Sequence, residues 1–319
     1  MFRPQITVVD CTIRDGGLMN NSNFDRETVG AVYRAIEASG VQVVELGYRN
    51  SKKMFPPDEY GPWRFCDEAD LRDVVGTQKR RVKLAVMMDA HKCDPNDLLP
   101  KSESVIDVVR VATYVKDIDK AIAVERAARA KGYETTINIM SISTARDREL
   151  DGALRQIEGE TAVKACYLVD SFGVLYCEDI DFYVEKFFRF LRNKEVGIHC
   201  HNNQQLAFAN TIGAIIRGVN YLDGTLLGIG RGAGNCPLEL LVGFLKNPRF
   251  DIRPVLDVIA KHILPLQETI QWGYYVPYMI TGILNMHPDV AMKVMNLEKG
   301  NPARTDFRGF YDRCLETVS

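Results

Sequence analysis

Short apolar segments recur along the chain and alternate with longer segments whose apolar residues are three or four positions apart. The short segments are rich in Val and Ile. Several are apolar throughout, which is typical of parallel strands buried on both faces. This pattern predicts eight strands: Ile6–Val9, Val41–Leu46, Val82–Met88, Val105–Val111, Thr135–Met140, Ala165–Val169, Glu195–Cys200 and Tyr221–Thr225.

Amphipathic segments lie between these strands. One of them carries Val29, Val32 and Ile36 on a single helical face and ends before Gly40, a residue type that often terminates helices. The connection from residue 51 to residue 81 contains two consecutive prolines, so we expect a loop with a short helix. The predicted helices are Arg26–Ser39, Asp117–Lys131, Glu178–Arg192, Gln204–Arg217, Leu238–Lys246 and, with a weaker pattern, Arg146–Gly159.

The alternation predicts an α/β protein with a (β/α)₈ TIM barrel, because this number of strand–helix units fits within about 240 residues. A doubly wound open sheet is the alternative. That fold usually has a dinucleotide-binding glycine-rich turn after its first strand, and the spacing is absent here. We predict a catalytic barrel over residues 1–250 and a short helical C-terminal extension over residues 251–319. The extension is expected to hold two or three helices between Val255 and Met295, interrupted at prolines.

Composition narrows the class of protein. The chain has 319 residues, of which 46% are hydrophobic and 26% charged, and its formal net charge is −2. It lacks the basic excess expected of proteins that bind nucleic acid or anionic membranes. No apolar stretch reaches the roughly 18 residues of a membrane span, and the N-terminus does not resemble a signal peptide. The eight cysteines show no metal-finger spacing. We therefore expect a cytoplasmic protein.

Polar residues follow the predicted strands at the ends where a barrel carries its active site. Buried polar groups are costly unless they are paired or functional, so their concentration at one face indicates a site there. We take four residues as candidate catalytic groups and four as candidate substrate-binding groups. The catalytic candidates are Arg14, Asp15 and Glu45 near strand ends and, outside this pattern, Tyr274 of the C-terminal segment. The substrate-binding candidates are Tyr48, Arg110, Asp170 and Gly230.

His199 and His201 are the strongest candidates for metal ligands in the sequence. Two residues apart on a strand, they point to the same face of the barrel, near its mouth. Asp15 follows the first strand, which lies next to the eighth in a closed barrel. Two imidazoles and a carboxylate can form a metal site with open positions for substrate. The alternative is two hydrogen-bonded histidines without a metal. The ligands suit Mn²⁺ or Mg²⁺, with Co²⁺ or Zn²⁺ as alternatives.

Two further features suit an anionic substrate. Arg14 is a fixed cation for a carboxylate or a developing enolate oxygen, although a structural ion pair with Glu45 or Asp10 is the alternative, and both roles can hold together. The segment 228–235 (GIGRGAGN) follows the last strand, and its glycines allow close approach of the backbone to a ligand. A plain flexible connection is the alternative reading of this loop.

These segments together resemble the metal-dependent barrel lyases that include 4-hydroxy-2-oxovalerate aldolase, HMG-CoA lyase and the isopropylmalate synthases, and are closest to the aldolases. The resemblance covers about residues 5–245, with a weaker continuation at 273–278 (GYYVPY), a tyrosine-containing helix. The motifs are 10–16 (DCTIRDG), 110–113 (RVAT), 199–203 (HCHNN) and 228–239 (GIGRGAGNCPLE).

The resemblance implies that Asp15, His199 and His201 are metal ligands, that Asn235 lies near the metal as a weaker ligand, and that Arg14 stabilises an enolate. It also implies a 2-oxo acid substrate that is bound to the metal. A base removes the 4-hydroxyl proton, and the C–C bond breaks to give pyruvate enolate and an aldehyde.

The sequence departs from the family pattern at the base. The aldolases have a histidine where this chain has Leu18, and the synthases have a glutamate where it has Gly17. His91, Tyr48, Tyr274, Tyr278 or metal-bound hydroxide are the substitutes to consider. The base therefore stays open at this stage.

Three functions compete. The first is an aldolase acting on a 4-hydroxy-2-oxo acid. The second is a Claisen-type acyltransferase that joins an acyl-CoA to a 2-oxo acid, and the third is a non-catalytic barrel that binds a metal or ligand. The aldolases resembled here pair with an aldehyde dehydrogenase through their C-terminal helices, so the extension is expected to contact such a partner or to form a homodimer.

Overall fold

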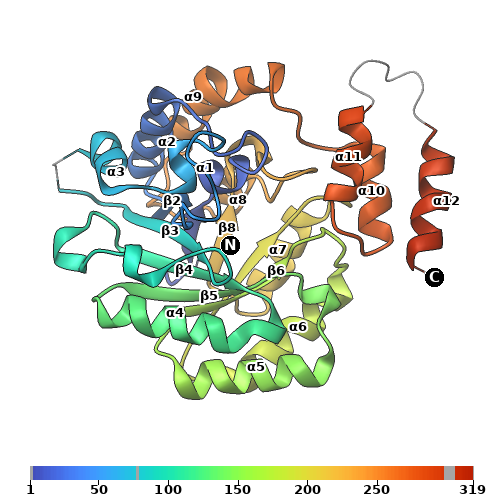
Figure 1. Ribbon diagram of the computed structural model, residues 1–319, viewed down its shortest axis with the longest axis horizontal. Coiled ribbons are helices and arrows are strands. Elements are labelled where there is room, and N and C mark those ends of the chain that lie inside the picture. The colour runs from blue at the N-terminus through green and yellow to red at the C-terminus, as the bar shows by residue number, and fades with distance from the viewer. Residues whose placement is uncertain (1–2, 77–78, 298–305, 319) are drawn as a thin grey trace.

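The computed structural model describes residues 3–76, 79–297 and 306–318. Within these residues, eight parallel strands close into a barrel in chain order, and Figure 1 shows the helices arranged around it. The predicted (β/α)₈ barrel is confirmed, and each predicted strand overlaps an observed one. The strands are β1 (Thr7–Asp10), β2 (Val43–Tyr48), β3 (Lys83–Asp89), β4 (Val108–Thr113), β5 (Glu134–Ile139), β6 (Ala165–Asp170), β7 (Glu195–Cys200) and β8 (Tyr221–Gly224).

The closure of the barrel brings the first strand next to the last two strands of the chain. β8 pairs with β1, with Asp10 opposite Gly224, and β8 also pairs with β7, with Ile198 opposite Leu222. The carboxyl ends of β1 and β7 are therefore separated only by β8. This register places the motif after β1 and the histidines of β7 at the same part of the barrel mouth.

The outer helices follow from the apolar periodicity. In α2, Val29, Val32 and Ile36 are fully buried, and the Asp25 side chain caps the helix by accepting a hydrogen bond from the backbone N–H of Thr28. The helices around the barrel are α2 (Arg26–Ala38), α3 (Glu68–Val75), α4 (Ile118–Ala130), α5 (Asp147–Glu160), α6 (Cys177–Phe190), α7 (Ala207–Ile216) and α8 (Leu238–Leu245).

One short helix was not predicted. α1 (Thr12–Gly16) begins directly after β1, and all five of its residues are buried. The Asp10 carboxylate accepts hydrogen bonds from the backbone N–H and the hydroxyl of Thr12 at 3.3 and 2.5 Å. This contact turns the chain sharply at the end of the strand, and the turn carries Arg14 and Asp15 into the barrel mouth.

The C-terminal segment divides into two groups of helices. α9 (Arg253–Val258) continues into a π-helical turn over Ile259–Ile263 and packs beside α2 (Figure 1). The helices α10 (Val276–Ile283), α11 (Asp289–Leu297) and α12 (Phe307–Val318) lie at one side of the barrel and share a separate apolar cluster with Ala233.

The predicted interruptions by proline agree with these bounds. α12 lies in the predicted helical extension, beyond the helices predicted between Val255 and Met295. Val255 and Ile263 belong to the main apolar core, so that core continues past residue 250. The division at 250/251 stays a prediction, and residues 298–305 and 319 of the predicted extension lie outside the described residues. None of the described helices is long and apolar enough to cross a membrane.

Candidate functional site

A chain of buried ion pairs runs beneath the barrel mouth. Arg14 Nε donates to Glu45 Oε2 at 2.7 Å, and Arg14 Nη1 also pairs with Asp15. The same Glu45 oxygen accepts from Arg110 Nη1 at 2.9 Å. Glu45 is completely buried between the two guanidinium groups. The structural ion pair of Arg14 with Glu45 is therefore present, and it holds Arg14 in one orientation.

Three side chains converge where β1 and β7 end. Asp15, His199 and His201 each offer a ligand atom, and these atoms all lie within 4.8 Å of one another. His199 Nε2 is 3.3 Å from Asp15 Oδ2. His201 Nδ1 and Asn235 Oδ1 are buried with no hydrogen-bond partner, and the two residues form a β-bridge. A divalent cation would satisfy these buried atoms, so the donor set fits one.

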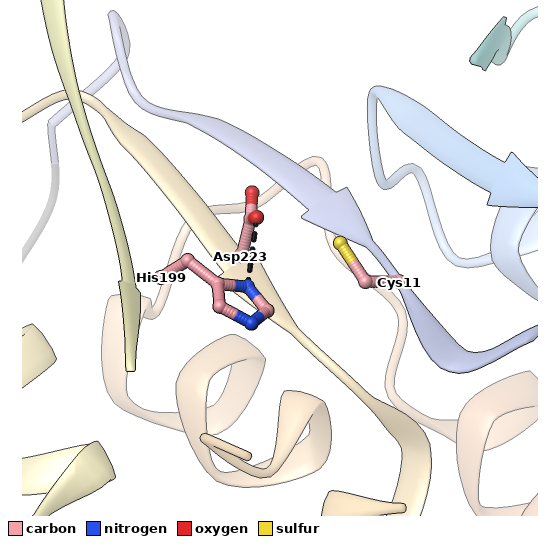
Figure 2. Close-up of side chains that lie close together, drawn as sticks. All are labelled: Cys11, His199 and Asp223. Atoms are coloured by element: carbon pink, nitrogen blue, oxygen red, sulfur yellow. Dashed lines mark hydrogen bonds and ion pairs between the residues drawn. The ribbon is translucent and has the colours of Figure 1, made fainter. Parts of the chain in front are cut away.

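Asp223 fixes the orientation of His199. His199 Nδ1 donates to Asp223 Oδ2 at 3.0 Å, the contact drawn as a dashed line in Figure 2. The same oxygen accepts from Arg110 Nη2 at 2.6 Å. With one proton held on Nδ1, Nε2 is the ring nitrogen that faces Asp15. A carboxylate behind a histidine is the usual outer support of a metal ligand.

A second group of three also has metal-ligand chemistry. Cys11, His199 and Asp223 lie close together at the ends of β1, β7 and β8 (Figure 2). Burial raises the pKa of the Cys11 thiol well above its usual range, whereas a metal ligand must be the thiolate. Asp223 is already engaged by Arg110. The group that contains Asp15 therefore fits a cation better.

Two members of the first group have charge states that suit metal binding. Burial alone would raise the pKa of Asp15, but Arg14 and then His201 hold that pKa well below its usual range. Burial lowers the pKa of His201 well below its usual range. Asp15 is therefore ionised and His201 neutral near pH 7, and these are the forms that bind a cation. In the third, His199, burial opposes protonation, but the contacts with Asp15 and Asp223 raise its pKa, so a cation there would displace a proton from the ring.

A cavity of about 370 Å³ opens above this cluster. Its lining residues include Arg14, Asp15, His199, His201 and Tyr48. A larger cavity of about 570 Å³ lies at the opposite end of the barrel, where β5 and β7 begin. That end is the stability face of a barrel, so we take the smaller cavity as the functional one.

The predicted substrate-binding residues fall into two groups. Tyr48 lines the cavity, and a Cβ added to Gly230 would lie 2.2 Å from Asn235 Nδ2 and 3.1 Å from Asp15 Oδ1. Gly230 is therefore needed for close packing around the proposed ligands. Arg110 is only 1% exposed and does not line the cavity. Its contacts favour a role in positioning Glu45 and Asp223.

Asp170 and Tyr274 also lie away from the cavity. Asp170 is buried and accepts hydrogen bonds from the backbone N–H groups of Val174 and Leu175, and burial raises its pKa to about 6. Tyr274 is 53% exposed, just before α10. His91, one of the substitutes considered for the base, instead pairs with Asp117 at 2.9 Å.

Three residues of the site were missed or left without a role. Asp223 was noted at the end of a strand, but its contact with His199 depends on the barrel register. Arg64 lies in the long connection after β2, and His287 lies in the C-terminal segment, yet both line the cavity. Nothing in the local sequence pattern marks either residue, because only the packing of distant segments brings them to the mouth.

Known proteins resemble the chain over most of its length. It is 32% identical over 262 residues to the 4-hydroxy-2-oxovalerate aldolase of Thermus thermophilus, covering 81% of this chain and 74% of that one. It is 30% identical over 241 residues to the oxaloacetate decarboxylase of Mycobacterium tuberculosis, covering 75% and 70%. These two relatives share a barrel-sized region with the chain.

Solved structures agree with the fold. The N-terminal domain of a putative aldolase from Bacteroides vulgatus matches with a TM-score of 0.80 at 30% identity, covering 91% of this chain and 97% of that one. HMG-CoA lyase from Brucella melitensis matches with a TM-score of 0.66 at 16% identity, covering 82% and 99%, and supports the fold alone. The HMGL-like family model matches residues 5–268, which confirms the resemblance seen in the motifs: the chain belongs to the HMGL-like family.

Proposed function

We propose that this protein is a divalent-metal-dependent aldolase that cleaves or forms a C–C bond of a 4-hydroxy-2-oxo acid. The observation that carries the proposal is the buried cluster of Asp15, His199 and His201 in the lining of the cavity. The relatives named as 4-hydroxy-2-oxovalerate aldolases, at about 30% identity over most of the chain, support the same chemistry. They favour the aldolase over the Claisen-type acyltransferase.

The proposed ligands are Asp15, His199 and His201, with Asn235 as a weaker fourth. Nitrogen and oxygen donors without thiolate suit Mn²⁺ or Mg²⁺ best, and Co²⁺ or Zn²⁺ are compatible. A bound divalent cation supplies fixed positive charge that polarises the 2-oxo group and stabilises negative charge on its oxygen. The family and the donor set support the binding of a divalent metal ion. Which ion is bound is part of the proposal.

The chain itself supplies orientation and charge. Arg14 lines the cavity while Glu45 and Asp15 hold its guanidinium, so it presents a fixed cation to the substrate carboxylate or to the enolate oxygen. His287 lines the same cavity and is the candidate to accept the 4-hydroxyl proton, whereas burial raises the pKa of the Tyr48 phenol and keeps it protonated. His287 Nε2 lies 3.2 Å from Arg231 Nη1, and the Arg231 backbone N–H donates to Asp15 at 3.2 Å.

Decarboxylation of oxaloacetate is a second candidate activity, because one of the relatives is named for it. Both reactions release pyruvate through the same enolate, and they differ in whether an aldehyde or carbon dioxide leaves. The residues that hold the 2-oxo acid would therefore serve both. Separate measurement of aldehyde and carbon dioxide distinguishes the two.

The decisive experiment is pyruvate release from 4-hydroxy-2-oxovalerate and from oxaloacetate, followed with lactate dehydrogenase. Metal-depleted protein is assayed before and after addition of Mn²⁺, Mg²⁺, Co²⁺ or Zn²⁺. We expect turnover that depends on added metal and is lost in Asp15→Asn and His199→Ala. Acetyl-CoA-dependent release of a thiol would support the acyltransferase instead. Metal binding without turnover of any 2-oxo acid would support the non-catalytic barrel.

The partner and the location are also proposed. The substrate is a small 2-oxo acid, and the C-terminal helices are proposed to contact an aldehyde dehydrogenase or a second copy of the chain. In support, Phe307, Tyr311 and Leu315 are partly exposed at helical spacing on α12. A cytoplasmic location remains a prediction. Light scattering of the purified protein, alone and with a dehydrogenase, tests the assembly.

A further inference from the structure

We propose that Arg64 and Asn50 form an anion-binding subsite that holds a carboxylate or phosphate on the aldehyde half of the substrate. The inference rests on the proposed function and narrows its substrate class. The substrate would then carry negative charge at both ends, with its 2-oxo acid end at Arg14 and the other charged group at Arg64.

Arg64 sits in an aromatic enclosure on the wall of the cavity. It ends the short 3₁₀ turn Pro62–Arg64 and is only 7% exposed. Its guanidinium carbon lies 4.9 Å from the ring centre of Tyr48 and 5.1 Å from the ring centres of Phe55 and Tyr60. The three rings surround the guanidinium and attract its positive charge.

The guanidinium has no acceptor for its N–H groups. Its Nε is buried without a hydrogen-bond partner, and within residues 3–76, 79–297 and 306–318 no carboxylate or carbonyl pairs with the side chain. Aromatic faces attract the positive charge, but they do not replace an oxygen acceptor for five N–H donors. A buried cation in this state is costly. An anion in the cavity would supply both the countercharge and the acceptors.

Asn50 lies beside Arg64, and its side chain also has buried polar atoms without hydrogen-bond partners. The Asn50 backbone N–H donates to the Arg64 carbonyl at 3.2 Å, and the residue is only 4% exposed. Both polar atoms of its side-chain amide are buried without a partner. The two side chains line the same cavity as Asp15 and His199. A guanidinium and an amide together can surround one anionic group with donors.

The other cations of the cavity are already engaged. Arg14 pairs with Asp15 and Glu45, and Lys92 pairs with Asp89 at 3.0 Å. Arg231 donates to the Ser171 carbonyl at 2.9 Å. Among the lining cations in the described ranges, Arg64 is the one without such a contact.

Tyr48 connects the two ends of the cavity. It follows Glu45 and Gly47 on β2 and stacks on Arg64, and its phenol also lies within electrostatic range of Arg14. A substrate bound between the two guanidinium groups would therefore pass Tyr48. When the 4-hydroxy-2-oxo acid is cleaved, the C3–C4 bond breaks and the electron pair of that bond forms the enolate of pyruvate. The 4-hydroxyl proton goes to the base, and C4 becomes the carbonyl of an aldehyde that keeps the anionic group.

The test is condensation of pyruvate with matched aldehydes by the metal-loaded protein, followed as loss of pyruvate. Propanal is the neutral aldehyde, succinic semialdehyde carries a carboxylate, and glyceraldehyde 3-phosphate carries a phosphate. We expect kcat/KM for at least one anionic aldehyde to exceed that for propanal by about 10- to 100-fold, the range of hydrogen bonds to charged groups. The two anionic arms distinguish a carboxylate from a phosphate.

Arg64→Gln is expected to remove most of this preference, and Arg64→Lys to keep part of it. Asn50→Asp, which adds a carboxylate to the subsite, is expected to lower the preference in a chain that keeps Arg64. Lys53→Gln is the matched control, because it removes a cation from the same loop at an exposed position outside the cavity lining. The ratio of anionic to neutral kcat/KM is read within each variant, so a partly inactive preparation does not distort it.

Equal kcat/KM for charged and neutral aldehydes in the unaltered protein would overturn the proposed subsite. The proposed aldolase function would not be affected by that result. Absence of turnover with every aldehyde would instead overturn the proposed function. The subsite is then judged by thermal stabilisation with succinate or inorganic phosphate. Stabilisation that is lost in Arg64→Gln supports the subsite, and its absence in the unaltered protein refutes it.

Discussion

Asp223 offers a test of the metal centre that leaves every proposed ligand in place. Its Oδ2 accepts hydrogen bonds from His199 Nδ1 at 3.0 Å and from Arg110 Nη2 at 2.6 Å, and the residue is 2% exposed. Asp223→Asn keeps the shape of the side chain but replaces the carboxylate by an amide. The amide N–H₂ can donate to Nδ1, which would move the imidazole proton to Nε2, the nitrogen that faces Asp15.

The magnitude follows from the two contacts. Loss of the supporting carboxylate behind a histidine ligand typically weakens metal binding about 10- to 100-fold, which corresponds to roughly 1.4–2.7 kcal/mol. Arg110 keeps its ion pair with Glu45 at 2.9 Å. Since hydrogen bonds to charged groups contribute about 1.5–3 kcal/mol, we expect the free energy of unfolding to fall by no more than that.

The assay is titration of metal-depleted protein with Mn²⁺ by calorimetry, together with urea unfolding to establish that the variant is folded. Asp170→Asn is the matched control, because it makes the same change at a buried aspartate of β6 that accepts from the backbone N–H groups of Val174 and Leu175 rather than from a histidine. A folded Asp223→Asn protein whose Kd for Mn²⁺ stays within about threefold of the unaltered protein would refute the reasoning, since the expected minimum is about tenfold.

Three further predictions follow from the same site. Asp15→Asn should weaken Mn²⁺ binding by at least about tenfold, because it removes a proposed ligand. Cys11→Ala should leave Mn²⁺ binding unchanged. If Cys11→Ala weakened binding and Asp15→Asn did not, the group that contains Cys11 would be the metal site. Gly230→Ala places a Cβ 2.2 Å from Asn235 Nδ2, so we expect a loss of about 1–3 kcal/mol in unfolding free energy and weaker metal binding, and unchanged values in both assays would contradict the packing argument. Burial raises the pKa of Asp10 to about 7. The folded state therefore retains a proton that the unfolded chain releases above about pH 4, and stability from this group is lost as pH rises toward 7, by up to about 1.4 kcal/mol per unit. Urea unfolding from pH 5 to pH 8 should show Asp10→Asn gaining stability relative to the unaltered protein, and parallel profiles would refute the shift.

Sequence patterns alone determined the architecture of this protein. The eight strands were predictable because each is a short apolar run bounded by polar residues, and parallel strands of a barrel are buried on both faces. The two histidines of β7 were predictable as a pair, because alternate residues of a strand share a face. The motif at Arg14 and Asp15 was recognisable, but the short helix that carries it was not, since five residues show no helical periodicity.

The tertiary structure decided which polar residues share the cavity. Asp223 meets His199 only through the register of β7, β8 and β1, and Arg64 reaches the mouth only because the long connection after β2 folds back over it. Conversely, Arg110 is equally polar in sequence, yet its partners Glu45 and Asp223 hold it below the cavity. Local sequence sets periodicity over a few residues, whereas side chains separated by tens of residues meet only after closure of the barrel has placed their strands side by side.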